Sequence, residues 1–125
     1  MKKILYVEDD EDTAEAVKII LDREGYDINL AKSGKDALLK VVTKKDSFDL
    51  IMLDIMLPDM NGWQILKKFQ DAKIKTNFIM LSSVPLSSVG RERLRILGVQ
   101  DYIMKPFERD DLVERVKSVF NVYKP

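Results

Sequence analysis

Five short apolar segments are spaced along the chain, and each gap between two of them is long enough for a helix. The segments are rich in aliphatic and aromatic residues, a pattern typical of strands buried inside a sheet. The second segment matches this pattern less well than the others. We therefore predict strands at residues 4–7, 26–31, 48–53, 78–81 and 100–104.

Amphipathic stretches fill the gaps, and several of them begin with residues that cap helices. Asp12 with Glu15, and Ser33 with Asp36, have the spacing of a capping box, in which each side chain bonds to the backbone of the other residue. Asn61 stands at the start of a third helical stretch. Two more helices are predicted after the fourth and fifth strands.

Strands that alternate with helices predict an α/β fold with a single doubly wound, five-stranded parallel sheet and helices on both faces. Consecutive parallel strands need a long crossover connection, which the helices supply. Ligands of such sheets bind beyond the carboxyl ends of the strands. The residues that follow each strand are therefore the first candidates for function.

Composition excludes several classes of protein. The 125 residues predict one domain that spans residues 1–125. Lys plus Arg and Asp plus Glu both number 21, which argues against direct nucleic-acid binding and a polybasic membrane anchor. The chain has no cysteine and no histidine, which excludes disulfides, thiolate ligands and imidazole bases. The apolar run at residues 4–7 is too short for a signal peptide or a membrane span, so we expect a cytoplasmic protein.

Acidic, hydroxyl and amine side chains follow four of the predicted strands. They are Glu8 and Asp9 after the first strand, Asp54 after the third, Ser82 after the fourth and Lys105 after the fifth. A parallel sheet brings these positions to one edge. Two carboxylates about 5 Å apart repel each other by roughly 3 kcal/mol at an effective dielectric constant of about 20. The cluster therefore needs a cation, or one acid must hold a proton.

An oxygen-only set of ligands suits Mg²⁺, which keeps water molecules and leaves positions for phosphate oxygens. A carboxylate nucleophile, a divalent ion, a hydroxyl donor and an ammonium group are the parts that phosphoryl transfer uses. Any one of these acids alone is most simply a solvated loop residue. Their occurrence at one edge of a single sheet, together with Ser82 and Lys105, favours a site for phosphoryl transfer.

Four segments of the chain resemble the receiver domains of bacterial and archaeal two-component response regulators. They are residues 7–10 (VEDD), 54–62 (DIMLPDMNG), 79–82 (IMLS) and 101–107 (DYIMKPF). The four occur in the family's order, and the resemblance covers essentially the whole chain. It implies a flavodoxin-like (βα)5 sheet with the strand order 2-1-3-4-5.

The resemblance also implies a role for each matching acidic residue. Asp54 is the expected phosphate acceptor. Glu8 and Asp9 form the acidic pair that binds Mg²⁺, with Asp9 a direct ligand and Glu8 acting through a bound water molecule. Asp54 and the backbone carbonyl of Met56 complete the protein ligands, and Mn²⁺ is expected to substitute for Mg²⁺.

The other matching residues are expected to bind the phosphoryl group or to change conformation when it is bound. Ser82 is the switch hydroxyl, which hydrogen-bonds one phosphoryl oxygen, and Lys105 pairs with another. Tyr102 corresponds to the aromatic switch residue, whose ring turns inward when the hydroxyl moves. The bond between Lys105 and Pro106 is expected to be cis. The apolar Met56 and Val84 are expected to limit attack by water on the phosphorylated state.

Partners follow from the same resemblance. The phosphodonor is expected to be a phosphohistidine on a sensor histidine kinase or a histidine phosphotransfer protein. The surface of the fourth helix, fifth strand and fifth helix is expected to contact a downstream output domain or target protein, and to form a homodimer that depends on phosphorylation. The chain is expected to assist its own phosphorylation and dephosphorylation without being an enzyme in the usual sense.

Three alternatives stay open. A Mg²⁺-dependent phosphohydrolase of the haloacid dehalogenase type also forms an aspartyl phosphate, but it needs a second acid where Met56 stands. A flavodoxin-like electron carrier shares the fold, but the acids after the first strand would repel its phosphate. The third alternative is a docking module that is never phosphorylated, against which the intact Asp54, Ser82 and Lys105 argue.

Overall fold

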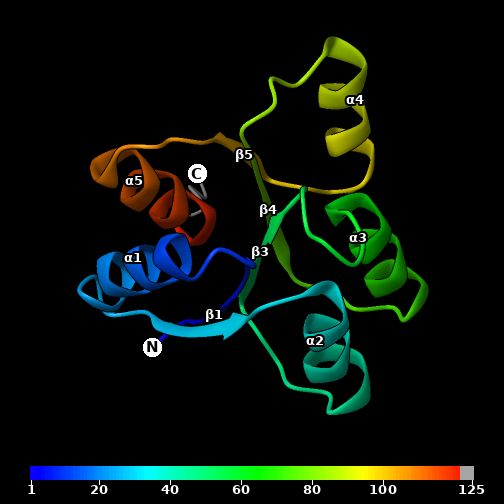
Figure 1. Ribbon diagram of the computed structural model, residues 1–125, viewed down its shortest axis with the longest axis horizontal. Coiled ribbons are helices and arrows are strands. Elements are labelled where there is room, and N and C mark those ends of the chain that lie inside the picture. The colour runs from blue at the N-terminus through cyan, green and yellow to red at the C-terminus, as the bar shows by residue number, and fades with distance from the viewer. Residues whose placement is uncertain (122–125) are drawn as a thin grey trace.

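The computed structural model describes residues 1–121, and a five-stranded sheet lies at its centre (Figure 1). The strands are β1 (Lys3–Val7), β2 (Asp27–Ala31), β3 (Leu50–Asp54), β4 (Asn77–Ser82) and β5 (Asp101–Met104). Neighbouring strands are all parallel, and their order is β2-β1-β3-β4-β5. The predicted fold class and the strand order implied by the resemblance are both confirmed.

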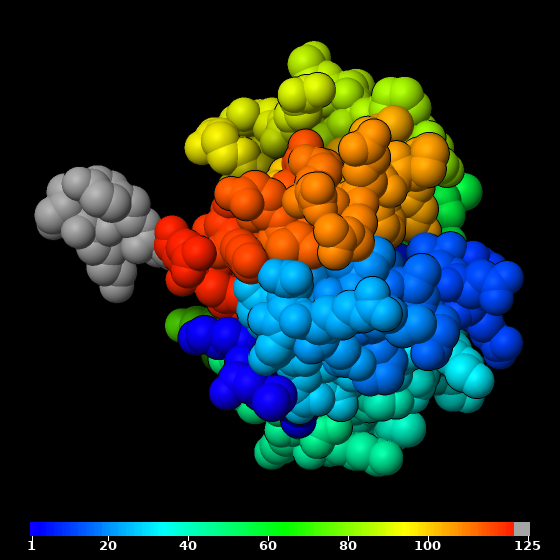
Figure 2. All heavy atoms as spheres, turned by 90° about the vertical axis from the view of Figure 1, so that its left-hand side faces the viewer, coloured from blue at the N-terminus to red at the C-terminus, as the bar shows by residue number. Residues whose placement is uncertain are grey.

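Helices cover both faces of the sheet. They are α1 (Glu11–Asp22), α2 (Gly34–Leu38), α3 (Gly62–Asp71), α4 (Ser88–Ile96) and α5 (Arg109–Phe120). In Figure 1, α1 and α5 lie on one side of the sheet, and α2, α3 and α4 lie on the other. Figure 2 looks onto the first side, where α1 and α5 pack against each other. Within residues 1–121, no helix is long and apolar enough to cross a membrane.

The sheet divides the hydrophobic core into two halves. Ile4 and Tyr6 of β1 pack with α1 and α5, whereas Leu5 and Val7 pack with α2 and α3. This follows from the strand geometry, because successive side chains point to opposite faces. β3 is buried at all of its positions, since it is central and has helices over both faces.

Strand boundaries differ from the predicted ones by one or two residues. Phe48, predicted to begin the third strand, lies before β3, although its side chain is buried in the core. Asp54 and Ser82, predicted to follow their strands, are instead the last residues of β3 and β4. Hydrophobicity reports burial of the side chain, whereas a strand is defined by backbone hydrogen bonds, and the two need not end together.

The predicted cap of the first helix is wrong. Asp10 occupies the N-cap position of α1, and its carboxylate accepts a hydrogen bond from the backbone N–H of Thr13 at 3.1 Å. Asp12 and Glu15 lie within the helix. The chain offers several acids at this point, and spacing alone did not identify which of them ends the loop.

The next two helices begin where predicted, but α2 departs from the prediction in two ways. Ser33 Oγ accepts a hydrogen bond from the Asp36 N–H at 3.0 Å, while the reciprocal bond of the capping box is missing because Asp36 accepts from another backbone N–H. The helix then widens into a π-helix, η1 (Leu39–Thr43). The start of α3 has a complete capping box between Asn61 and Gln64.

Candidate functional site

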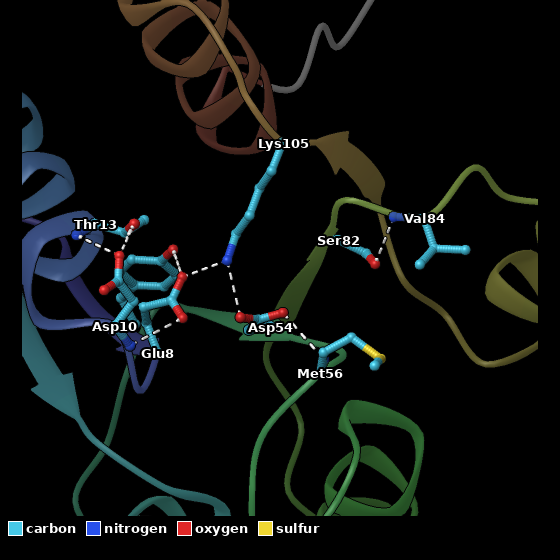
Figure 3. Close-up of polar contacts among 9 residues, drawn as sticks. Glu8, Asp10, Thr13, Asp54, Met56, Ser82, Val84 and Lys105 are labelled. Atoms are coloured by element: carbon cyan, nitrogen blue, oxygen red, sulfur yellow. Dashed lines mark hydrogen bonds and ion pairs between the residues drawn. The ribbon is translucent and has the colours of Figure 1, made fainter.

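The candidate residues converge at the carboxyl ends of four neighbouring strands (Figure 3). Asp54 lies beside Leu81 in the register of β3 and β4. The backbone N–H of Lys105 donates to the Ser82 carbonyl at 2.8 Å, which extends the pairing of β4 and β5. Glu8 follows β1, the other neighbour of β3. The prediction that these positions share one edge of the sheet is confirmed.

The Lys105 side chain extends across this edge and bridges two buried acids. Its Nζ donates to Asp54 Oδ2 at 2.8 Å and also to Glu8 Oε1 (Figure 3). Both carboxylate side chains are almost wholly buried, and the Lys105 side chain is only 21% exposed. Removal of one partner from a buried ion pair typically costs about 3–5 kcal/mol, because the remaining charge is left unpaired. The peptide bond between Lys105 and Pro106 is cis, as the resemblance implied.

Burial and the close approach of the three charged groups shift the pKa values of Glu8, Asp54 and Lys105. Burial, together with the neighbouring Glu8, raises the pKa of Asp54 to about 6, against the opposing pull of Lys105. Burial also acts to raise the pKa of Glu8, but its neighbours Asp54 and Lys105 lower it below the usual value. Burial acts to lower the pKa of Lys105, and its bonds to the two acids raise it above the usual value. When one of the two acids takes up a proton at low pH, that proton therefore resides on Asp54 rather than on Glu8.

Three carboxylates at this edge form a candidate metal site. One oxygen each from Glu8, Asp9 and Asp54 lies within 4.8 Å of the other two. Ligands about 2.1 Å from a shared Mg²⁺ lie at most about 4.2 Å apart, so small side-chain movements suffice. The Met56 N–H donates to Asp54 Oδ1 at 3.1 Å, which holds the Met56 backbone beside the cluster. Three negative charges against one ammonium fit a divalent cation, and the all-oxygen donor set fits Mg²⁺.

Ser82 and Tyr102 are linked through the backbone of one residue, Val84. The buried Ser82 Oγ accepts a hydrogen bond from the Val84 N–H at 3.1 Å, which leaves the hydroxyl proton available to donate (Figure 3). The Tyr102 hydroxyl donates to the carbonyl of the same Val84. The two predicted switch residues therefore share a neighbour, although they lie on different strands.

Tyr6 belongs to the site, and sequence reasoning missed it. Its side chain is fully buried, and its hydroxyl donates to Glu8 Oε1 at 2.9 Å. Burial and the neighbouring Glu8 raise the pKa of Tyr6 far above its usual value, so the hydroxyl keeps its proton and remains a donor. A signal was present in the sequence, because residues 6 and 8 are two apart and side chains at that spacing point to the same face of an extended strand.

Comparisons with known proteins agree with this geometry. Residues 4–117 match the family model of the response regulator receiver domain. The transcriptional regulatory protein HprR of Escherichia coli is 42% identical over 118 residues, which cover 93% of this chain and 50% of HprR. The transcriptional regulatory protein DltR of Streptococcus agalactiae is 37% identical over 115 residues, which cover 92% of this chain and 50% of DltR. The chain thus spans about half the length of the curated relatives it matches.

Solved structures show the same similarity. The non-phosphorylated receiver domain of HemR from Leptospira biflexa superimposes with a TM-score of 0.86 at 30% identity, covering 100% of this chain and 98% of that one. The response regulator TrrA of Thermotoga maritima, solved in complex with Mg²⁺-BeF, gives a TM-score of 0.78 at 33% identity, covering 95% and 99%. The chain belongs to the response regulator receiver domain family of two-component signal transduction.

Proposed function

We propose that this receiver accepts a phosphoryl group on Asp54 in a Mg²⁺-dependent reaction, with a phosphohistidine on a sensor histidine kinase or a histidine phosphotransfer protein as the donor. The observation that carries the proposal is the position of Asp54, which bonds to Lys105 Nζ and lies among the carboxylates of the candidate metal site. A nucleophile, an ammonium group and cation ligands are the parts that this chemistry needs. The complex of TrrA with Mg²⁺-BeF supports the choice of metal.

Four groups would hold the ion: the side chains of Glu8, Asp9 and Asp54 and the backbone carbonyl of Met56. Asp9 is assigned as a direct ligand, and Glu8 as a ligand through a water molecule. Bound Mg²⁺ supplies positive charge that offsets the charge on the phosphoryl oxygens. Mn²⁺ accepts the same oxygen ligands and is expected to substitute.

In the proposed step, a carboxylate oxygen of Asp54 attacks phosphorus, and the phosphorus–nitrogen bond to the donor histidine breaks. The electron pair of that bond stays on the imidazole, and the phosphoryl group becomes an aspartyl phosphate. Lys105 pairs with one phosphoryl oxygen, and the Ser82 hydroxyl donates to another. Attack by water later releases inorganic phosphate and restores Asp54, and we propose that Met56 and Val84 slow this hydrolysis.

The phosphoryl group is proposed to change the surface of α4, β5 and α5 through Val84. If Ser82 Oγ turns toward the phosphoryl group, it releases the Val84 N–H, and the Val84 carbonyl that binds the Tyr102 hydroxyl moves with it. Tyr102 is then free to turn inward. The size of such a shift is limited by the difference in contacts that the phosphoryl group makes in the two states.

This surface is assigned to signal output. We propose that it contacts a downstream output domain or target protein, or a second copy of the chain in a homodimer that depends on phosphorylation. Residues 1–125 are proposed to form one receiver domain with a cytoplasmic location and no direct contact with nucleic acid. The receiver family serves signalling rather than turnover of a substrate.

Incubation with acetyl phosphate and Mg²⁺, followed by intact mass measurement, tests the acceptor. Wild-type protein is expected to gain the mass of one phosphoryl group, and Asp54→Asn is expected to gain none, because its amide is not a nucleophile. Omission of Mg²⁺ should abolish the adduct.

Two results would contradict the proposal. Equal adducts on wild type and Asp54→Asn would place the phosphoryl group on another residue. No adduct on either protein, although Mg²⁺ binds, would favour the docking module that is never phosphorylated.

A further inference from the structure

We infer that Asp59 is a positioning residue for the metal site, because it ties the loop that carries Met56 to the first turn of α2. The inference rests on the proposed function in one respect, the assignment of the Met56 carbonyl as a metal ligand. It adds a residue outside the site and a helix, α2, that contributes no group to the reaction.

The Asp59 carboxylate makes two hydrogen bonds to the backbone of α2. Oδ1 accepts from the Gly34 N–H at 3.0 Å, and Oδ2 accepts from the Lys35 N–H at 2.9 Å. These are the first two N–H groups of the helix, which have no partner within it. Burial acts to raise the pKa of Asp59, but the backbone donors together lower it below the usual value, so the carboxylate is held as an anion. A negative group at this end is also favoured by the helix dipole.

The next residue of the loop, Met60, packs directly onto the same turn. A Cβ atom at Gly34 would lie 2.4 Å from Met60 Cγ, so only glycine leaves room for this side chain. Two successive loop residues therefore contact α2, one through hydrogen bonds and one through packing. Figure 1 shows α2 and α3 next to each other on this face of the sheet.

The contact with α2 fixes the loop at a third point. At its base, the Ile55 N–H donates to the Leu81 carbonyl at 2.9 Å, and the Gly62 N–H donates to the Ile55 carbonyl at 2.8 Å. Between Ile55 and Asp59 lie Met56, Leu57 and Pro58, and the ring of proline restricts its φ. A segment this short has little freedom when both of its ends are held. The direction of the Met56 carbonyl therefore depends on Asp59.

Ser33 provides a matched control, because its side chain caps the same turn without a hydrogen bond to the loop. Its Oγ accepts from the Asp36 N–H at 3.0 Å, the next N–H of α2. Ser33→Ala and Asp59→Ala both remove bonds from the N-terminus of α2. Only Asp59→Ala also releases the loop that carries Met56.

The test is a titration with MgCl2 that follows the amide NMR signals of uniformly labelled protein. Asp59→Ala is expected to raise the Kd for Mg²⁺ roughly three- to tenfold, which lies within the usual range for residues that couple to a site without touching the ligand. Ser33→Ala should change it by less than about twofold. A background of about 0.5 M KCl, where the screening length is about 4 Å, removes any direct attraction between the Asp59 charge and the ion. Asparagine has the same shape as aspartate but only one acceptor oxygen, so the Kd of Asp59→Asn is expected to fall between those of wild type and Asp59→Ala.

A second readout uses the reciprocity of coupled sites. If the loop connects α2 to the metal site, Mg²⁺ should slow amide hydrogen exchange at Gly34 and Lys35 in wild type and lose this effect in Asp59→Ala. Equal changes of Kd in Ser33→Ala and Asp59→Ala would overturn the inference, because Asp59 would then be only a helix cap. An unchanged Kd in Asp59→Ala and Asp59→Asn would overturn it as well. These measurements use Mg²⁺ alone, so a failure of phosphorylation on Asp54 would leave them interpretable.

Discussion

Lys105 holds two buried carboxylates that would otherwise repel each other, and the three groups therefore act as one electrostatic unit. Of the two acids, Asp54 retains a proton more readily, because burial and Glu8 both act in that direction. A raised carboxyl pKa means that the folded chain binds this proton more tightly than the unfolded chain does. Asp54 therefore favours the fold below about pH 4, and this contribution is lost as the pH rises through about 6.

The same pKa predicts how metal binding depends on pH. Below about pH 6 the ion must displace a proton from Asp54, so we expect the affinity for Mg²⁺ to fall by up to tenfold for each further pH unit. Titrations between about pH 7.5 and about pH 5 measure this directly. In Asp54→Asn, which has no proton to lose, the affinity should be lower but nearly constant over that interval. An affinity that is constant in wild type would show that Asp54 is already ionised at the lower pH.

Sequence alone predicted most of the site at the scale of residues. Asp54, Ser82 and Lys105 could be placed together because each lies at the end of an apolar segment, and parallel strands end at one edge. The sharing of Lys105 between Glu8 and Asp54 could not be predicted, since it depends on the path of a flexible side chain. Tyr6 was missed because a tyrosine in an apolar strand is most simply interpreted as a core residue. Its hydroxyl indicates a role in the site only once Glu8, its hydrogen-bond partner, is known to be buried.

At the scale of elements, glycines at helix starts allow close approaches that a side chain would prevent. A Cβ atom at Gly62, the first residue of α3, would lie 3.0 Å from both the Asp54 carbonyl oxygen and Ile55 Cα. Both are backbone atoms at the end of β3 and cannot move without shifting the Asp54 side chain, the proposed acceptor. At Gly90 in α4, the nearest atom is Leu86 Cδ1, the mobile end of a side chain, at 2.7 Å.

These two glycines give a matched pair of substitutions. Gly62→Ala is expected to destabilise the fold by about 1–3 kcal/mol, since overpacking against backbone outweighs the helix propensity of alanine, worth at most about 1 kcal/mol. Gly90→Ala should leave stability unchanged or raise it by up to about 1 kcal/mol, because Leu86 can turn away. Urea unfolding of the two variants measures both effects. Equal losses of stability in the two would show that the contacts at Gly62 are not responsible.

Elements were predictable wherever one physical signal dominated. The strands could be recognised because their apolar segments are buried between helices, and α3 because Asn61 marks its start; the reciprocal bond of Gln64 emerged only from the structure. The end of α2 could not be predicted. Its conversion to the π-helix Leu39–Thr43 depends on packing against the rest of the molecule, and helical periodicity does not distinguish the two forms over a single turn.

At the scale of the whole molecule, burial is unevenly distributed. Every residue of β3 is buried, whereas Leu94 is the one buried residue of α4. Val89 and Ile96 of α4 are 78% and 69% exposed. The proposed acceptor therefore lies on a strand that is buried at every position, and the surface proposed for output includes a helix with one buried residue.

Hydrogen exchange should reveal this difference. We expect the amides of α4 to exchange at least about a hundredfold faster than those of β3, because α4 can detach without opening the main core. The comparison is made within one sample by NMR, so differences in protein stability between samples do not enter. Equal protection of α4 and β3 would mean that the whole molecule opens as one unit.

The link between Ser82 and Tyr102 has a consequence for how such a receiver can be modified over generations. Both hydrogen bonds use main-chain atoms of Val84, its N–H and its carbonyl, and neither uses its side chain. Any residue other than proline at position 84 can therefore make the same two hydrogen bonds. The side chain at this position can therefore vary while both hydrogen bonds stay the same, which leaves it available for the role proposed above, control of how long the phosphoryl group remains on Asp54.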